Sequence, residues 1–436
     1  MEANNEHLAT EVVAEHSLAE HSLAELMKNM SYNFRKSISA HGHAKDELMS
    51  ALQKYIRRGE TKKAIYVAIE LELFSHIVEA RALVTNTVNR LRVCLPEELA
   101  CSLTSPSTAL EFDIYYQTFE SNREDSSEKA IAARRAAMIN MVSLLAEAPK
   151  QRLASDIKAT YFVPEAKQFA LASGDPVLAA LYADEEFTID DQVRGKFALV
   201  PGDHHSLATI ADGILTNIKR RSDRAFYWLS LLVDATENKV PCGARRLTPK
   251  ARPQPNPMHL MFELCFEYAK RGARMWDAKA EAPHAGWTRM MLDMLEIAGD
   301  YYKHFGLSKQ GKAKSHRDWI LFVIWPLLYC VRDVDWARNP ASSVHLVSHA
   351  KATEMYEAHG KQPPLVIDDY VIDQHTARGR SLKRKGDHFA QVGAAVENAD
   401  DTLFLPANRR LYEEFKKHQA QSDAATHTRK KKTIAQ

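Results

Sequence analysis

Apolar residues recur at helical spacing on both sides of a glycine near the start of the chain. Residues 51–74 read ALQKYIRRGETKKAIYVAIELELF, and their apolar positions form one face before Gly59 and another after it. Gly59 stands where a left-handed residue commonly ends a helix. The pattern predicts a helical hairpin whose turn carries basic residues.

A later stretch predicts a second hairpin of the same kind. Residues 214–234 read ILTNIKRRSDRAFYWLSLLVD and align with the first hairpin when one turn residue is dropped. Ile56-Arg57-Arg58 then corresponds to Ile218-Lys219-Arg220. A short gapped match between helical sequences also arises by chance, but it favours two units built alike.

The rest of the chain is also mostly helical in pattern. Further helices are predicted over residues 84–93, 128–148, 258–270, 287–304 and 343–359. Pro96 and Pro149 mark the expected ends of the first two. The most apolar run, residues 319–330, is too short to span a bilayer and predicts a buried core helix. Strand patterns are confined to residues 197–200 and a short stretch near Leu403, so the expected fold class is all-α, a helical-hairpin bundle with few or no strands.

At 436 residues the chain exceeds the size at which single cores stop growing, so several units are expected. The N-terminus holds an imperfect AEHSL repeat that matches neither helical nor strand periodicity. Residues 240–258 form a proline-rich basic connection. The predicted units are a flexible tail (1–44), a collar-like helical domain (45–165), a second helical unit (166–257), a helical domain (258–362) and a C-terminal extension with a basic tail (363–436).

Composition narrows the class of protein. Hydrophobic residues make up 45% and charged residues 26%, which is typical of a soluble globular protein. Five scattered cysteines without a CxxC pair argue against a disulfide framework and fit a reducing compartment. The first residues carry acids where a signal peptide carries bases. We therefore expect no membrane association and an intracellular protein, cytoplasmic or nuclear.

Motifs for catalysis are missing from the sequence. No Gly-Lys pair fits the pattern GxxxxGK[ST] of a phosphate-binding loop, and GxSxG, HExxH and CxxC are absent. The sequence therefore predicts a protein that is not an enzyme and needs no cofactor.

One segment is a candidate metal site. In DDYVIDQHTARGR, three carboxylates lie near His375 in sequence, those of Asp368, Asp369 and Asp373. The set suits a divalent metal or acid–base chemistry. The alternative is that His375 and Thr376 begin or cap a helix, whose N-terminus favours acids. The His204-His205 pair is a weaker metal candidate because no third ligand lies nearby in sequence.

Basic clusters are the stronger functional signal. With a net charge of only +2, nucleic-acid binding has to depend on local patches. Such groups bind phosphates without sequence preference, or they are solvated helix faces balanced by neighbouring glutamates. The terminal RKKK is either a nuclear-import signal or a basic arm. The predicted nucleic-acid contacts are Lys54, Arg57, Arg58, Lys219, Arg220, Arg221, Arg245 and Arg246.

Residues 45–160 resemble the C-terminal helical region of MgsA/RarA-type AAA+ ATPases. The matching positions of the first hairpin are Ser50, Ala51, Leu52, Lys54, Ile56, Arg57, Ala64 and Tyr66. Further matches are Arg90, Leu91, Glu97 and the segment LLAEAPKQRLASD, residues 144–156. Glu98 stands where that family has Asp, and Leu99-Ala100 replaces its Ile-Gly. The resemblance implies a clamp-loader-like oligomerisation domain used at replication forks, here without the ATPase module.

These observations lead to one expected function and two alternatives. We expect a non-catalytic accessory protein of DNA replication or repair that forms homo-oligomers, binds nucleic acid and meets other replication proteins. One alternative is a structural or assembly protein, such as a viral one, that makes only protein–protein contacts. The other is a metal-dependent enzyme using Asp373 and His375.

Overall fold

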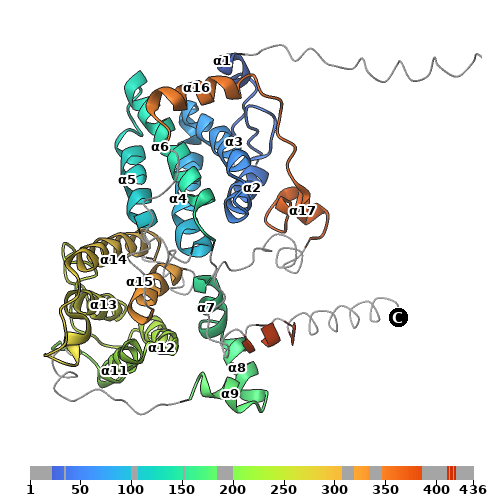
Figure 1. Ribbon diagram of the computed structural model, residues 1–436. Coiled ribbons are helices and arrows are strands. Elements are labelled where there is room, and N and C mark those ends of the chain that lie inside the picture. The colour runs from blue at the N-terminus through green and yellow to red at the C-terminus, as the bar shows by residue number, and fades with distance from the viewer. Residues whose placement is uncertain are drawn as a thin grey trace, which may run out of the picture.

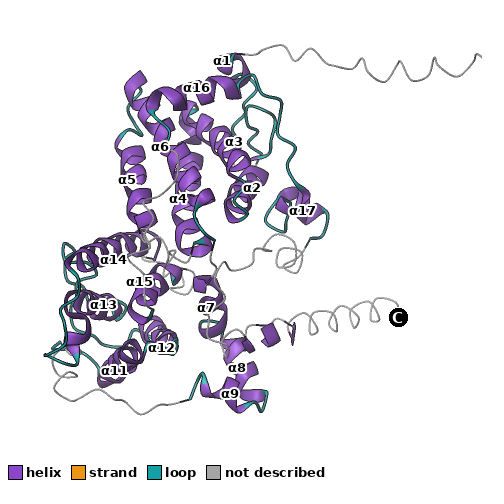
Figure 2. Ribbon diagram, viewed as in Figure 1, coloured by secondary structure: helices purple, strands orange, loops and turns teal. Residues whose placement is uncertain are grey.

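The protein is all-α, as predicted (Figures 1 and 2). The structure, a computed structural model, describes residues 22–33, 36–99, 107–150, 153–183, 200–306, 319–332, 346–384 and, within 410–418, all but residues 412 and 416. Only isolated bridges and no sheet occur in these parts of the chain. The predicted strands at 197–200 and near Leu403 lie outside them, apart from Val200.

The helices gather in two bundles that share one core. The first bundle contains α1 (Leu23–Met27), α2 (Lys45–Arg57), α3 (Thr61–Glu72), α4 (Arg81–Glu98), α5 (Ser107–Ser121), α6 (Glu128–Glu147) and α16 (His349–His359). The second contains α11 (His205–Arg220), α12 (Ala225–Glu237), α13 (His259–Arg271), α14 (Ala285–Gly306) and α15 (Leu321–Val331). Between them and below lie α7 (Leu153–Tyr161), α8 (Pro164–Ala172) and α9 (Pro176–Ala180), while α17 (Ala377–Ser381) lies beside α2. Short 3₁₀ turns cover Leu73–His76, Val78–Ala80, Gly272–Met275 and Asp369–Val371.

Both predicted hairpins are confirmed. Gly59 has a φ of 69° directly after α2, so the chain turns through the left-handed region that glycine adopts without strain. In the second hairpin Arg221 takes the left-handed conformation instead, with a φ of 54° after α11. The basic second turn therefore reverses the chain without a glycine.

Helix ends follow local chemistry in one case and tertiary packing in another. Ser127 caps α6 by accepting a hydrogen bond from the backbone N–H of Ala130, and α6 stops before Pro149 as predicted. The prediction that a helix ends at Leu95-Pro96 is wrong, because α4 continues through Pro96 to Glu98. Glu98 is buried against Arg57, and this packing outweighs the backbone hydrogen bond that a proline cannot make.

The central apolar helix is buried as predicted. Every residue of α15 is buried, and the helix contacts α4 and α7 as well as α13 and α14. A single hydrophobic cluster extends from Leu48 in α2 to α14 and α15 without a break. The predicted boundaries at 165/166 and 257/258 therefore do not separate independent cores. Among the described residues, no helix is both long and apolar enough to cross a bilayer.

The end of the described chain returns to its beginning. Helix α16 packs against α6, α3 and α1, although the sequence grouped it with residues 258–362. The segment after it runs along α2, where the Ser50 hydroxyl donates to the carbonyl of Val371. At the other end, residues 36–44 depart from the expected flexible tail, since the Ser39 hydroxyl and the ring of His41 both bind Glu70 of α3.

Candidate nucleic-acid interface

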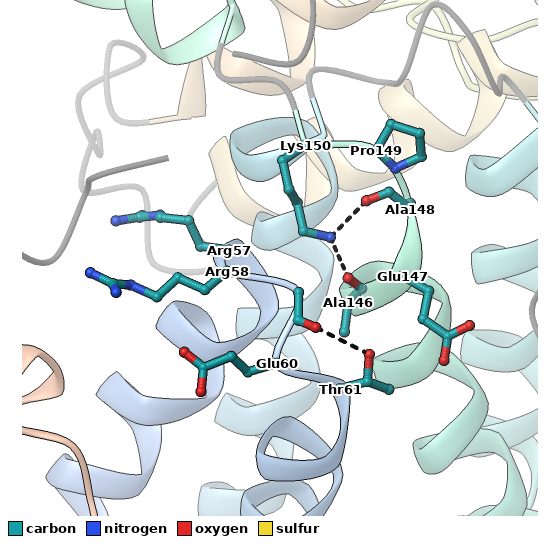
Figure 3. A pocket seen from close by; sticks show the side chains of 10 residues that line it. Arg57, Arg58, Glu60, Thr61, Ala146, Glu147, Ala148, Pro149 and Lys150 are labelled. Carbon is teal, nitrogen blue, oxygen red and sulfur yellow. Dashed lines mark hydrogen bonds between the residues drawn. The ribbon is translucent and has the colours of Figure 1, made fainter. Parts of the chain in front are cut away.

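A hollow of about 730 Å³ lies beside the first hairpin turn (Figure 3). It is formed where the α2–α3 turn meets the end of α6. Its lining residues are Arg57, Arg58, Gly59, Glu60, Thr61, Ala146, Glu147, Ala148, Pro149 and Lys150. Three bases line the hollow, so the partner of each one determines whether it can hold phosphate.

Lys150 is turned toward the end of α6. Its Nζ donates to the carbonyl oxygen of Leu145 at 2.6 Å. It also donates to those of Ala146 and Ala148, at 2.7 and 2.8 Å (Figure 3). These carbonyls have no partner within the helix, so the ammonium group stabilises the helix end. Burial lowers the pKa of Lys150 to about 8. The side chain is therefore a structural cap.

The Arg57 side chain is also held inside the protein by an ion pair. Its guanidinium donates to both carboxylate oxygens of Glu98, with Nε at 2.7 Å and Nη2 at 2.5 Å. Burial would lower the pKa of Arg57, but the hydrogen bonds and charge of Glu98 outweigh it and raise the pKa. Both side chains are fully buried, so this predicted contact has no surface to offer to nucleic acid.

Lys54 is buried as well. Its Nζ lies 2.6 Å from Oδ2 of Asp373 and also donates to the carbonyl of Val371 and the hydroxyl of Ser50. Burial lowers the pKa of Lys54. Burial would raise the pKa of Asp373, but the hydrogen bonds from Lys54 and from the backbone of His375 outweigh it and hold that pKa below its usual value. The pair fastens the C-terminal segment to α2.

Three bases of the first turn remain near the surface: Arg58, Lys62 and Lys63, the last of which pairs with Glu60 and Asp368. The Arg58 guanidinium lies 3.7 Å above the ring of Tyr370, which in turn donates to Glu60. Lys62 is exposed at the start of α3. The first turn therefore presents fewer bases than its sequence suggests.

The second turn carries three consecutive exposed bases. Lys219, Arg220 and Arg221 are all exposed, the first two in the last turn of α11 and the third at its left-handed cap. Beneath them, the buried Asp223 accepts hydrogen bonds from Arg332 at 2.5 and 2.6 Å. The turn is therefore fastened to the end of α15 by the Arg332–Asp223 ion pair, and its three bases are exposed.

The two predicted contacts in the proline-rich loop, Arg245 and Arg246, differ in burial. Arg245 is buried, where it donates to both oxygens of Asp203 and, at 2.8 Å, to Glu263. Arg246 is exposed and donates to the carbonyls of Pro249 and Ala251. Of this pair only Arg246 lies at the surface.

The structure does not bring the predicted metal ligands together. Asp369 pairs with Arg384, Asp373 pairs with Lys54, and the backbone N–H of His375 donates to Asp373 at 2.7 Å. Thr376 caps α17 by accepting a hydrogen bond from the backbone N–H of Gly379. The helix-start interpretation of DDYVIDQHTARGR is therefore confirmed.

The sequence interpretation missed a different cluster. His41, Glu70 and His359 meet in the first bundle with their ligand atoms within 4.8 Å of one another. The only local signal is the His41-Gly42-His43 spacing, and nothing in the sequence connects it to residues 29 and 318 positions further on. His204, from the weaker pair, caps α11 by accepting a hydrogen bond from the backbone N–H of Ser206.

Comparison with known proteins adds no relative. No family model, no curated protein and no solved structure matches the chain. The resemblance to the MgsA/RarA-type helical region stays a prediction.

Proposed function

We propose that the protein is a non-catalytic accessory factor that binds nucleic acid inside the cell through the α11–α12 turn. The observation that carries the proposal is the exposure of three consecutive bases, Lys219, Arg220 and Arg221, at one helix end. Clustered bases of this kind neutralise phosphates and release counterions, so they bind nucleic acid without reading its sequence.

The backbone at Arg221 supports this proposal. A non-glycine residue in the left-handed region is disfavoured by about 1–2 kcal/mol, yet arginine stands here with a φ of 54°. Gly59 occupies the equivalent place in the first hairpin without such strain. The chain therefore keeps a basic side chain where glycine would turn more easily, which fits selection for charge at this surface.

Arg246 and Lys62 are candidates for secondary contacts because both are exposed. Lys54, Arg57 and Arg245 are left out of the proposed interface, because each is held in a buried ion pair. Reversing the charge of Arg57 would place two carboxylates side by side in the core and test folding rather than binding.

Replication or repair as the setting, self-association and contact with other replication proteins come from the resemblance over residues 45–160. The confirmed α2–α3 hairpin is consistent with that resemblance. Size-exclusion chromatography with light scattering on nuclease-treated protein tests the oligomer. A monomer at micromolar concentration would contradict self-association. Large oligomers that bind no nucleic acid would favour a structural or assembly protein.

Binding itself is tested by fluorescence anisotropy with labelled single- and double-stranded DNA and with RNA at several salt concentrations. We expect the affinity to fall steeply as salt rises. The variant Lys219→Glu/Arg220→Glu should bind at least about 10-fold more weakly. The slope of log affinity against log salt concentration should also become shallower, by the equivalent of about two phosphate contacts. The matched control is Lys279→Glu/Arg289→Glu, which reverses two exposed charges elsewhere. Absence of salt-sensitive binding by the unmodified protein, or equal losses in both variants, would overturn the proposal.

A further inference from the structure

Away from the basic turns, three segments of the chain meet at one buried carboxylate. Glu70 lies in the last turn of α3, His359 is the last residue of α16, and His41 lies in the loop before α2. Oε1 of Glu70 is 2.7 Å from Nδ1 of His41 and 2.6 Å from Nε2 of His359. All three side chains are almost completely buried. In the described parts of the chain, this is the group whose ligand atoms lie close enough to hold a metal ion.

The Glu70 carboxylate is held by one oxygen and offers the other. Oε2 accepts a hydrogen bond from the Ser39 hydroxyl and one of 3.1 Å from the backbone N–H of His41. Oε1 faces the two imidazole rings. When a carboxylate binds a metal through one oxygen, its other oxygen is usually held by hydrogen bonds from the protein, as Oε2 is here.

The hydrogen bond on the far side of His41 determines which nitrogen carries a proton. Nε2 lies 3.0 Å from the carbonyl oxygen of Gln362, which only accepts, so Nε2 carries a hydrogen. A neutral His41 therefore directs the lone pair of Nδ1 at the carboxylate of Glu70. Two electron-rich atoms at that separation need a cation between them, either a proton or a metal ion.

We propose that His41 Nδ1, His359 Nε2 and Glu70 Oε1 form a site for a divalent transition-metal ion of the zinc class. Two imidazole nitrogens and one carboxylate oxygen are a donor set that Zn²⁺ accepts. The Nε2–H of His41 on a backbone carbonyl supplies the outer hydrogen bond that metal-bound histidines commonly make. Tetrahedral coordination at about 2.0–2.1 Å separates ligands by roughly 3.3 Å. From the present 2.7 and 2.6 Å, the imidazoles of His41 and His359 would move away from Oε1 by about 0.6 and 0.7 Å.

Aromatic and polar groups enclose the site. The ring of Tyr66 lies 4.6 Å from that of His359, and its hydroxyl accepts a hydrogen bond from the backbone N–H of Leu365. His43 Nε2 lies 3.4 Å from the same hydroxyl. This enclosure fits a metal that ties three segments together, and the proposal does not depend on nucleic-acid binding.

The test uses the full-length protein after treatment with a chelator and dialysis. Zn²⁺ binding is measured by isothermal titration calorimetry, and the melting temperature is followed with Zn²⁺ and with chelator. We expect one equivalent whose binding is weakened about 100-fold by His359→Gln, together with a melting temperature raised by Zn²⁺. Glutamine keeps a donor toward Glu70. The matched control is His349→Gln, an exposed histidine on the same helix, which should bind Zn²⁺ as the unmodified protein does.

A second measurement covers the case in which His359→Gln does not fold. Co²⁺ in place of Zn²⁺ gives visible absorption bands that report tetrahedral nitrogen and oxygen ligands. We expect these bands in the unmodified protein, their loss on adding Zn²⁺, and their loss in His41→Gln, which changes a different segment. The proposal is overturned if the folded protein binds no Zn²⁺, or if binding persists unchanged in His41→Gln. A proton would then be the cation that joins His41 to Glu70.

Discussion

Lys54 and Asp373 form a buried ion pair although 319 positions separate them in the chain. Their charged atoms lie 2.6 Å apart, and both side chains are 2% exposed. Removing one partner of such a pair leaves a buried charge unbalanced. The pair is therefore one of the contacts that hold the C-terminal segment on α2, together with the hydrogen bonds from Ser50 to Val371 and from Tyr55 to Asp368.

The first prediction is that Lys54→Met lowers the free energy of unfolding by about 3 kcal/mol. The aliphatic part of the side chain is kept, so the loss reports the unpaired Asp373 rather than a cavity. Urea denaturation measures the change. Lys62→Met, at an exposed position of the neighbouring helix, should stay within about 0.5 kcal/mol of the unmodified protein. Equal stability of the two variants would contradict a buried pair.

Adding Asp373→Asn to Lys54→Met should recover part of the loss, because the unbalanced charge is then gone. If the double variant loses as much free energy of unfolding as the two single variants together, or more, Lys54 and Asp373 are not coupled in this way.

A second prediction concerns Gly213 in α11. A Cβ at this position would overlap the indole ring of Trp228 in α12, because the ring packs directly on the backbone of Gly213. Gly213→Ala should lower the free energy of unfolding by about 3 kcal/mol, at the upper end of overpacking effects. At Gly286, in the first turn of α14, a Cβ would lie 3.2 Å from Nδ1 of His284, an exposed ring that can shift. Gly286→Ala should therefore stay within about 1 kcal/mol of the unmodified protein. Thermal or urea unfolding of both variants checks the contrast.

The local pattern was enough to predict most of the helices, although not α5, α7, α8 or α9. It did not show which of their charges are buried. Leu52, Ile56 and Gly59 gave the first hairpin because apolar spacing and a turn glycine are local features. Arg57 and Arg58 look alike in sequence, yet one is buried against Glu98 and the other lies over Tyr370. Whether each arginine is buried depends on side chains that belong to distant segments of the chain.

The same reason explains the missed His41–Glu70–His359 cluster. Its members come from a loop, from α3 and from α16, and no spacing rule relates them. Conversely, Asp369 and His375 are neighbours in sequence but have separate partners in space. Proximity along the chain was a poor guide to ligand sets in this fold.

A third prediction separates stability from binding at Arg221. Both Arg221→Gly and Arg221→Ala remove the charge, but only glycine removes the strain of a φ of 54°. Arg221→Gly should therefore be more stable than Arg221→Ala by about 1 kcal/mol. Both should weaken DNA binding to the same degree in anisotropy measurements. If the variants differ in binding, backbone geometry rather than charge is the contribution of this residue.

A fourth prediction follows from the ionisation of Asp203. Burial would raise its pKa, but the hydrogen bonds from Arg245 and from the backbone amides of Gly243 and Val200 outweigh burial and hold the pKa below the usual value. A carboxylate with a lowered pKa in the folded state stabilises the protein above its unfolded pKa of about 4. This contribution is lost as the pH falls through the lower, folded value.

Asp203→Asn should therefore be destabilised by about 3 kcal/mol at pH 7, since Arg245 stays buried beside a neutral partner. The difference from the unmodified protein should hold at pH 5 and shrink below about pH 4, where Asp203 takes up a proton in the unfolded chain while it is still ionised in the folded protein. Glu263, the other acid on Arg245, has a pKa raised by burial and is present in both proteins, so its titration largely cancels in the comparison. Urea denaturation at pH 7, 5, 4 and 3 measures the difference, with the exposed Asp293→Asn as the control. A difference that stays constant down to pH 3 would show that Asp203 is not ionised against Arg245 in the folded protein.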